Sequence, residues 1–207
     1  MITATPNPAI TLHGLKLSGH VHRVELMLNV LGLPYAFVQA GADVRATEAF
    51  RKLNPLGQIP VLQDGELCLS DSTAIMVYLC KRYAPGSAWL PEDALGAAAV
   101  QRWLSIASGE VAHGPADARA AALFKKPVDV ARAQATAQRL LGFMDSHLES
   151  RPFLAAPQPT IADLACYAYV ARAPEGGISL APFGNVRAWL GRIEALPHFV
   201  PMPESAP

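Results

Sequence analysis

The sequence has few cysteines, and none of them are close together. Cys68, Cys80 and Cys166 are widely spaced and form no CxxC pair. This spacing offers neither a disulfide framework nor a structural zinc site, and it is typical of a reducing compartment. We therefore expect three buried thiols, no metal, and a cytoplasmic location.

The sequence also lacks an excess of charge of either sign. Lys and Arg together number 17, as do Asp and Glu, so the formal net charge is zero. No basic stripe or polybasic run is present to attract nucleic acid or anionic lipid. No apolar run is long enough to span a bilayer. The start, Met1 to Pro8, lacks the basic and apolar parts of a signal peptide. We expect neither nucleic-acid nor membrane partners.

What is present is ample apolar sequence, at 51% of residues, with strand and helix signals alternating through the first 83 residues. Runs that favour strands lie at 9–13, 35–38, 59–62 and 67–69. Apolar residues with helical spacing lie between or after them, at 21–31, 46–53 and 73–83. The Asp64-Gly65 pair between the last two runs is a strong hairpin signal. The order βαβαββα predicts a mixed four-stranded sheet.

Strand signals stop after a Pro- and Gly-containing linker at 85–93. Helical patterns follow at 94–124, with a break at Gly114-Pro115, and then at 128–150, 160–169 and 186–196. We therefore expect two domains, an α/β domain at 1–84 and an all-α helical domain at 92–207. The Pro-rich end, 201–207, is expected to fray.

A proline stands at the start of the third expected strand, in the run Asn54-Pro55-Leu56-Gly57-Gln58-Ile59-Pro60. Proline donates no ladder hydrogen bond, so it belongs at a strand start or edge. If the Ile59–Pro60 bond is cis, the chain turns sharply, and the backbone N–H and C=O of Ile59 stay free to pair with an extended peptide. A plain turn before a hairpin fits the spacing equally well.

Two further segments place polar residues at helix starts. Asp71 and Ser72 precede an apolar helix, where they would serve as caps or would hold the ammonium and carboxylate of an amino-acid ligand. Ser18 precedes the first helix. Its hydroxyl would either cap that helix or donate a hydrogen bond to a thiolate, which lowers a thiol pKa. Taken singly, capping explains each segment.

Together, in this order within one βαβαββα unit, the three segments resemble the cytosolic glutathione transferases of the bacterial serine type, with relatives in the phi, tau and zeta classes. The interval from Ser18 to Arg23 matches the serine-to-arginine interval of those classes. The resemblance covers essentially the whole chain: 9–84 resemble the family's thioredoxin-like domain and 94–200 its helical domain. In the latter, Thr160 and Asp163 resemble a capping box.

The resemblance implies a role for each matching residue. Ser18 would activate the thiol of glutathione, the co-substrate. Six residues would bind glutathione: Arg45, Gln58, Ile59, Pro60, Asp71 and Ser72. Asp71 and Ser72 would hold its γ-glutamyl group, and Ile59 would pair with its cysteinyl unit.

Two assignments stay open, the cation for the glycine carboxylate and the position of the activating serine. The family often carries a His-Lys pair for the glycine carboxylate, and the matching positions here are Arg45-Ala46. Arg45 would replace that cation, or Arg51 or Lys52 would reach the carboxylate instead. A register closer to the insect delta class would place Gly19 at the serine position.

The second substrate, a small apolar electrophile, is expected between the domains. The expected lining residues are His20, Trp103, Ala107 and His113, with Leu15, Ile106, Glu110 and Tyr169 as further candidates. His20 is either a packing residue or a donor or base toward the thiol. The family resemblance also implies a homodimer. A glutathione-dependent peroxidase, dehalogenase or isomerase, or a non-catalytic glutathione-binding adaptor, stays an alternative because fold does not fix chemistry.

Overall fold

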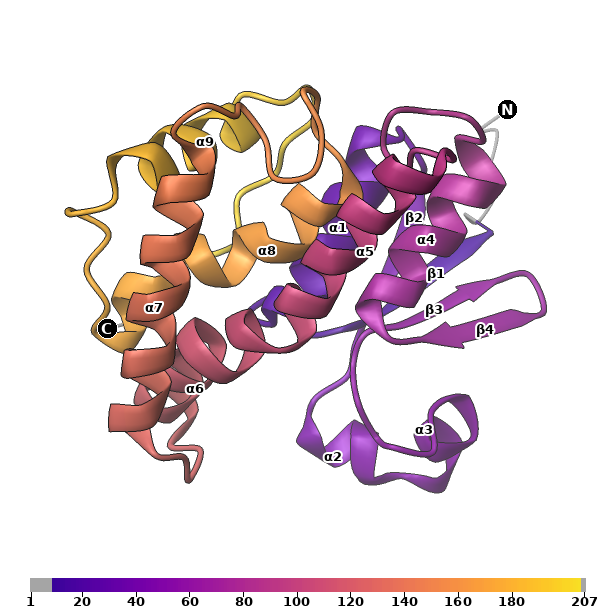
Figure 1. Cartoon of the computed structure of the whole chain (residues 1–207). Coiled ribbons are helices and arrows are strands. Elements are labelled where there is room, and N and C mark those ends of the chain that lie inside the picture. The colour runs from indigo at the N-terminus through magenta and orange to yellow at the C-terminus, as the bar shows by residue number, and fades with distance from the viewer. Residues whose placement is uncertain (1–8, 206–207) are drawn as a thin grey trace, which may run out of the picture.

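The computed structural model describes residues 9–205 of the chain. Its first part alternates strands and helices (Figure 1) in this order: β1 Ile10–Gly14, α1 Gly19–Val30, β2 Tyr35–Gln39, α2 Ala42–Ala46, α3 Glu48–Leu53, β3 Val61–Asp64, β4 Leu67–Ser70 and α4 Ser72–Tyr83. The strands form one sheet in the order β2-β1-β3-β4, with β2 parallel to β1 and the other pairs antiparallel. The predicted mixed four-stranded sheet is confirmed.

The two faces of the sheet are covered by different helices. Leu12 of β1 pairs with Leu62 of β3, and both are fully buried in the core that α1 and α4 share with the helical domain. The neighbouring Val61 points to the opposite face, because successive strand residues alternate. There it packs in a small second cluster with Phe50 of α3. The sheet is thus the middle layer of the N-terminal domain.

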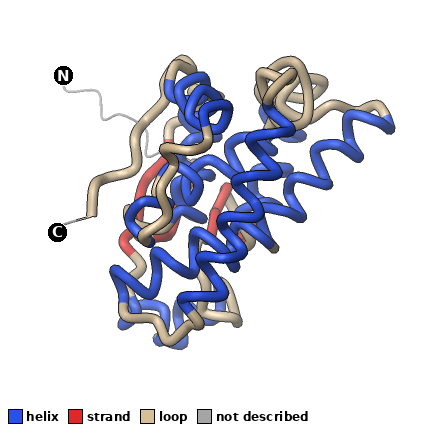
Figure 2. The backbone as a smooth tube through the Cα atoms, turned by 60° about the vertical axis from the view of Figure 1, so that its left-hand side comes forward, coloured by secondary structure: helices blue, strands red, loops and turns tan. Residues whose placement is uncertain are grey.

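After α4, the described part of the chain contains helices and loops but no strand, and the helices pack side by side (Figure 2). They are α5 Ala94–Ser108, a π-helical turn Ala112–Ala116, α6 Asp117–Phe124, α7 Val130–Leu148, α8 Ile161–Ala171, a 3-10 turn Ala173–Gly176 and α9 Gly184–Glu194. In the described part of the chain, no helix is both long and apolar enough to cross a membrane.

Helix α8 is the centre of the helical domain. Every residue from Ile161 to Val170 is buried, and α8 packs against both α1 and α5. Thr160 and Asp163 form the predicted capping box. The carboxylate of Asp163 also accepts hydrogen bonds from Leu154 N (2.9 Å) and Trp189 Nε1 (2.9 Å). This buried carboxylate therefore connects the start of α8 both to α9 and to the loop that precedes α8.

Three local predictions need correction. The helix expected at 46–53 begins at Glu48, because Thr47 caps it by accepting from Phe50 N, and a separate short helix, α2, that was not predicted precedes it. The break expected at Gly114-Pro115 is a π-helical turn, a wider ladder that accommodates the proline within a continuous helical path. Cys68 is exposed rather than buried, because it lies on the edge strand β4.

The described part of the Pro-rich end is packed rather than frayed. Met202 is only 4% exposed, and its carbonyl oxygen accepts a hydrogen bond from Arg172 Nη2. Ser205 Oγ lies 3.2 Å from Arg119 Nη2. The segment up to Ser205 therefore belongs to the folded helical domain. Residues 206–207, also covered by that prediction, and the start at 1–8 lie outside the described residues.

Candidate functional site

A cavity of about 880 Å³ lies where the loop after β1, the loop before β3 and the start of α4 face helix α6. Ten residues predicted from the sequence line it: Leu15, Ser18, His20, Arg45, Gln58, Ile59, Pro60, Asp71, Ser72 and Tyr169. The fold thus brings together three segments that are distant in the sequence.

Ser18 occupies the N-cap position of α1. Its backbone N–H donates to Leu15 O at 2.9 Å, which closes the loop after β1. Its Oγ accepts from Val21 N at 3.4 Å, a long capping bond. Because the hydroxyl only accepts in that bond, its proton stays available to a group in the cavity. The serine therefore caps the helix and can donate at the same time.

Gly19, the position favoured by the delta-like register, lies beneath an aromatic ring. A Cβ at Gly19 would come within 2.7 Å of the Tyr169 ring. The close approach of α8 to the start of α1 therefore requires glycine here. Tyr169 itself lines the cavity, as does Leu15.

The peptide bond Ile59–Pro60 is cis, which matches the first of the two alternatives for this segment. Asn54 is 3% exposed and organises the preceding loop: Nδ2 donates to Gln58 O at 2.9 Å, and Oδ1 accepts from Leu56 N at 3.1 Å. Among residues 9–205, no partner hydrogen-bonds to the backbone of Ile59. Its N–H and C=O can therefore pair with an extended ligand.

Asp71 is the N-cap of α4 and has a positive φ of 71°, which is strained for a residue other than glycine. Three groups donate to its Oδ1, namely Thr73 N (2.9 Å), Thr73 Oγ1 (2.5 Å) and Ala74 N (3.0 Å). Partial burial acts to raise the pKa of Asp71, but these hydrogen bonds outweigh it and leave the pKa below its usual value. The carboxylate is therefore ionised at neutral pH, and Oδ2 is left for a cation.

Beneath Asp71, a buried arginine supports the neighbouring serine. Arg23 is 1% exposed, and its Nη1 donates to Ser72 Oγ at 3.3 Å. Since that bond occupies a lone pair of Ser72, the serine hydroxyl can turn its proton toward an anion. Nε and Nη2 of Arg23 are buried without a hydrogen-bond partner within the described residues. This part of the cavity therefore suits a carboxylate.

The two histidines of the first helix differ in position. His20 lines the cavity, with its ring 5.1 Å from that of Tyr169. Burial, with a smaller effect of the Arg23 charge, lowers the pKa of His20 to about 3, so its imidazole is neutral at pH 7. His22 lies away from the cavity, where its Nε2 is 2.8 Å from Val200 O. His22 is thus a packing residue.

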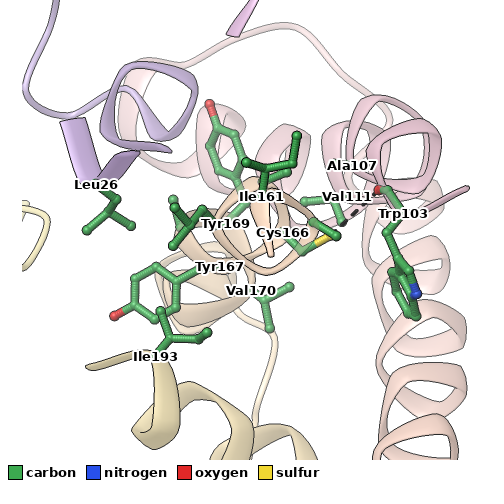
Figure 3. Close-up of a cluster of buried hydrophobic side chains, with 14 of the residues drawn as sticks. Leu26, Trp103, Ala107, Val111, Ile161, Cys166, Tyr167, Tyr169, Val170 and Ile193 are labelled. Atoms are coloured by element: carbon green, nitrogen blue, oxygen red, sulfur yellow. Dashed lines mark hydrogen bonds between the residues drawn. The ribbon is translucent and has the colours of Figure 1, made fainter. Parts of the chain in front are cut away.

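Helix α5 does not supply the cavity wall that the sequence predicted. Trp103 and Ala107 are almost fully buried in the cluster around α8 (Figure 3), where Cys166 Sγ lies 3.9 Å from Trp103 O. The Trp103 ring also stacks on Phe143 of α7, with centroids 5.5 Å apart. Ile106 and Glu110 face a separate groove between α5 and α7. Trp103 and Ala107 therefore do not line the cavity as predicted, because the helical phase of α5 turns them into the core.

His113 is exposed and 3.3 Å from Asp117 Oδ2, outside the cavity lining. Besides Tyr169 of α8, the wall on the helical side comes from the last residue of the π-helical turn, from α6 and from the residues after it: Ala116, Arg119, Ala120, Phe124, Lys125, Lys126 and Pro127. Sequence reasoning missed this wall. The Phe124-Lys125-Lys126 run was the available signal, since it joins an apolar side chain to two cations just before a proline.

The cation expected near the glycine end of the ligand is Arg45. It lines the cavity, and its Nε donates to Gly41 O at 3.3 Å. Arg51 and Lys52 do not line the cavity, and Lys52 pairs with Glu48 on the surface. Among the three candidates for the glycine carboxylate, the geometry thus favours Arg45.

These features define a thioredoxin-like domain with a cis-proline segment, joined to an all-helical domain across a shared cavity. Family models agree with this class: one for the glutathione S-transferase N-terminal domain matches residues 12–87, and one for the C-terminal domain matches 127–192. The chain is 34% identical to glutathione S-transferase 3 of Zea mays, covering 92% of this chain and 91% of the maize protein. The chain belongs to the glutathione S-transferase family.

Solved structures agree with the assignment. A glutathione S-transferase from Pseudomonas fluorescens superposes with a TM-score of 0.88 and is 31% identical, with 95% of this chain and all of that chain covered. A glutathione transferase homologue from Drosophila mojavensis, solved with bound glutathione, is 27% identical with a TM-score of 0.80. The alignment with it covers 91% of this chain and 89% of that chain.

Proposed function

We propose that this chain transfers glutathione to small apolar electrophiles and that Ser18 activates the thiol. The observation that carries the proposal is the placement of the Ser18 hydroxyl, with an available proton, on the cavity shared by Ile59 and Asp71. A thiolate there would accept a hydrogen bond from Ser18 and face the positive end of α1, both of which favour the charged form.

Glutathione would lie extended along the cis-proline segment. Its cysteinyl backbone would pair with Ile59, and Gln58 would contact its glycine end or backbone. Its ammonium group would bind Asp71 Oδ2, and its γ-glutamyl carboxylate would bind Ser72 and the start of α4. Arg45 would take the glycine carboxylate.

We further propose that residues 1–84 and 92–207 act as two domains, that the second domain supplies the electrophile wall, and that the protein is a cytoplasmic homodimer. Glutathione is the co-substrate in this scheme, and no metal takes part. Gel filtration with light scattering measures the oligomeric state, and a mass of one chain would contradict the dimer.

The thiolate absorbance of the protein–glutathione complex, titrated against pH, tests the central step. Free thiols ionise near pH 8.5. We expect a lower pKa in the wild-type complex, by roughly two units, and a return toward the free value in Ser18→Ala. Bound glutathione with an unshifted pKa in the wild type would overturn activation by Ser18.

A second variant tests the glutathione site independently of the thiol. Asn caps helices as well as Asp does and tolerates a positive φ, so Asp71→Asn should fold normally. It removes the charge that faces the ammonium group. We expect glutathione affinity to fall about tenfold or more, measured by calorimetry, with unchanged thermal unfolding. Unchanged affinity would show that the γ-glutamyl group binds elsewhere.

A further inference from the structure

The cavity carries more positive charge than glutathione needs. Five cations line it, at Lys16, Arg45, Arg119, Lys125 and Lys126, and one carboxylate, at Asp71. Three of these cations have carboxylate partners within the described residues: Lys16 with Glu25, Arg119 with Glu175, and Lys126 with Asp117. Arg45 and Lys125 have none there. The proposed function assigns Arg45 to the glycine carboxylate of glutathione. Lys125 is therefore the cation of this set that has neither a carboxylate partner within the described residues nor an assigned role.

Lys125 lies on the electrophile side of the cavity. It follows the last residue of α6, Phe124, whose side chain is 55% exposed and lines the same cavity. Lys125 Nζ is 3.2 Å from the carbonyl oxygen of Ala122, and Lys126 Nζ is 2.8 Å from Asp117 Oδ1. An aromatic face and two ammonium groups thus stand together opposite the glutathione segments.

The backbone at Lys125 adds a second observation. Lys125 has φ 54° and ψ 30°, the left-handed conformation. Glycine or asparagine usually occupies that position after a helix, because the left-handed conformation brings the Cβ of other residues too close to the following carbonyl oxygen. The chain nevertheless has lysine there, and its side chain lines the cavity. A positive side chain at the end of α6 also suits the helix dipole, so this feature supports the inference without carrying it alone.

We propose that the preferred electrophile is an aromatic or similarly apolar molecule that carries an anionic group, with its ring near Phe124 and its anion at Lys125 and Lys126. This inference rests on the proposed function and narrows its substrate class. A neutral electrophile would leave Lys125 without a counter-charge in the complex. An anionic one would complete the charge pairing of the cavity.

The test compares two acceptors of the same shape: a chlorodinitrobenzoate with the chlorine para to the carboxylate, and its methyl ester. In each reaction the thiol proton goes to water, the sulfur forms a bond to the ring carbon, and chloride leaves with the bonding electrons. Each kcat/KM is divided by the uncatalysed rate constant, which removes the difference in intrinsic reactivity. We expect the wild-type KM to be about two- to fivefold lower for the benzoate, the range of an exposed ion pair, and the difference to shrink with added salt.

Lys125→Gln should raise the KM for the benzoate by a similar factor, and Lys126→Gln should act in the same direction. The KM for the ester and the KM for glutathione should stay unchanged. Lys81→Gln is the matched control, because Lys81 pairs with Glu92 on the surface and does not line the cavity. Equal wild-type KM values for the two acceptors would overturn the inference and leave the transferase proposal intact. A raised KM for glutathione in Lys125→Gln would also overturn it, since Lys125 would then bind glutathione. If neither acceptor reacts faster than in buffer, both proposals fail.

Discussion

Arg119 Nη1 donates a hydrogen bond to the carbonyl oxygen of Leu17 at 2.8 Å, across 102 positions of sequence. A residue of α6 thereby holds the residue next to Ser18. The Arg119 guanidinium also pairs with Glu175 and donates to Ser205 Oγ, and the residue is 2% exposed. The helical domain thus fixes the loop that carries the proposed thiol-activating serine.

The first prediction concerns this contact. Arg119→Met should lower the free energy of unfolding by about 3 kcal/mol, because it breaks a buried ion pair and leaves Glu175 with a weaker set of partners. It should also raise the pKa of the thiol of bound glutathione, because the loop that carries Ser18 loses the hydrogen bond from Arg119 to Leu17 O. Urea unfolding and the thiolate titration measure the two effects. Arg102→Met, at an exposed site, is the control and should change stability by less than about 0.5 kcal/mol. Wild-type stability in Arg119→Met would contradict the buried pairing.

The second prediction concerns the capping box of α8. Asp163→Ala leaves the N–H groups of Leu154, Thr160 and Trp189 without their carboxylate acceptor. Each buried donor without a partner costs about 1–3 kcal/mol, so we expect a loss of more than about 3 kcal/mol in urea unfolding. Asp129→Ala removes the single exposed capping bond of α7 and should cost only about 1 kcal/mol. Similar losses in both variants would show that the buried network adds nothing beyond a cap.

The third prediction compares two glycines in helices. Gly19→Ala places a methyl group 2.7 Å from the Tyr169 ring, so the ring or one of the helices α1 and α8 must shift. We expect a loss of about 1–3 kcal/mol in thermal or urea unfolding. Gly142→Ala, within α7, has no atom within 4 Å of the added methyl group and should instead gain roughly 0.5–1 kcal/mol. A gain in both variants would mean that α8 does not approach α1 as closely as described.

The fourth prediction concerns pH. His20 faces Arg23, Asp71 and Lys126, and its pKa is lowered from 6.5 to about 3, mainly by burial. Between these values the unfolded chain takes up a proton at His20 that the folded protein does not. The free energy of unfolding should therefore fall as the pH decreases below 6.5, by no more than about 1.4 kcal/mol per pH unit from this residue.

His20→Gln should flatten that dependence when urea midpoints at pH 7 and pH 5 are compared. Burial also lowers the pKa of His22, so part of the slope should remain in the variant. His113→Gln, at an exposed position, is the control. An unchanged slope in His20→Gln would show that His20 takes up its proton equally well in the folded and unfolded states.

The sequence alone determined the features that depend on short-range spacing. The hairpin at Gly65, the caps at Ser18 and Asp71, and the capping box at Thr160 each follow from residues a few positions apart. The hydrophobic periods predicted the mixed sheet and the helical half in the same way. These signals are local because a turn or a cap is satisfied by neighbouring backbone groups.

Only the tertiary structure decided which helix faces the cavity. The phase of α5 turns Trp103 into the core, while Phe124 and Lys125 at the end of α6 line the cavity together with the cis-proline segment. The contact between Arg119 and Leu17 likewise depends on how the two domains pack. Packing angles and helical phase arise from contacts between residues far apart in the sequence, so spacing within one segment does not encode them.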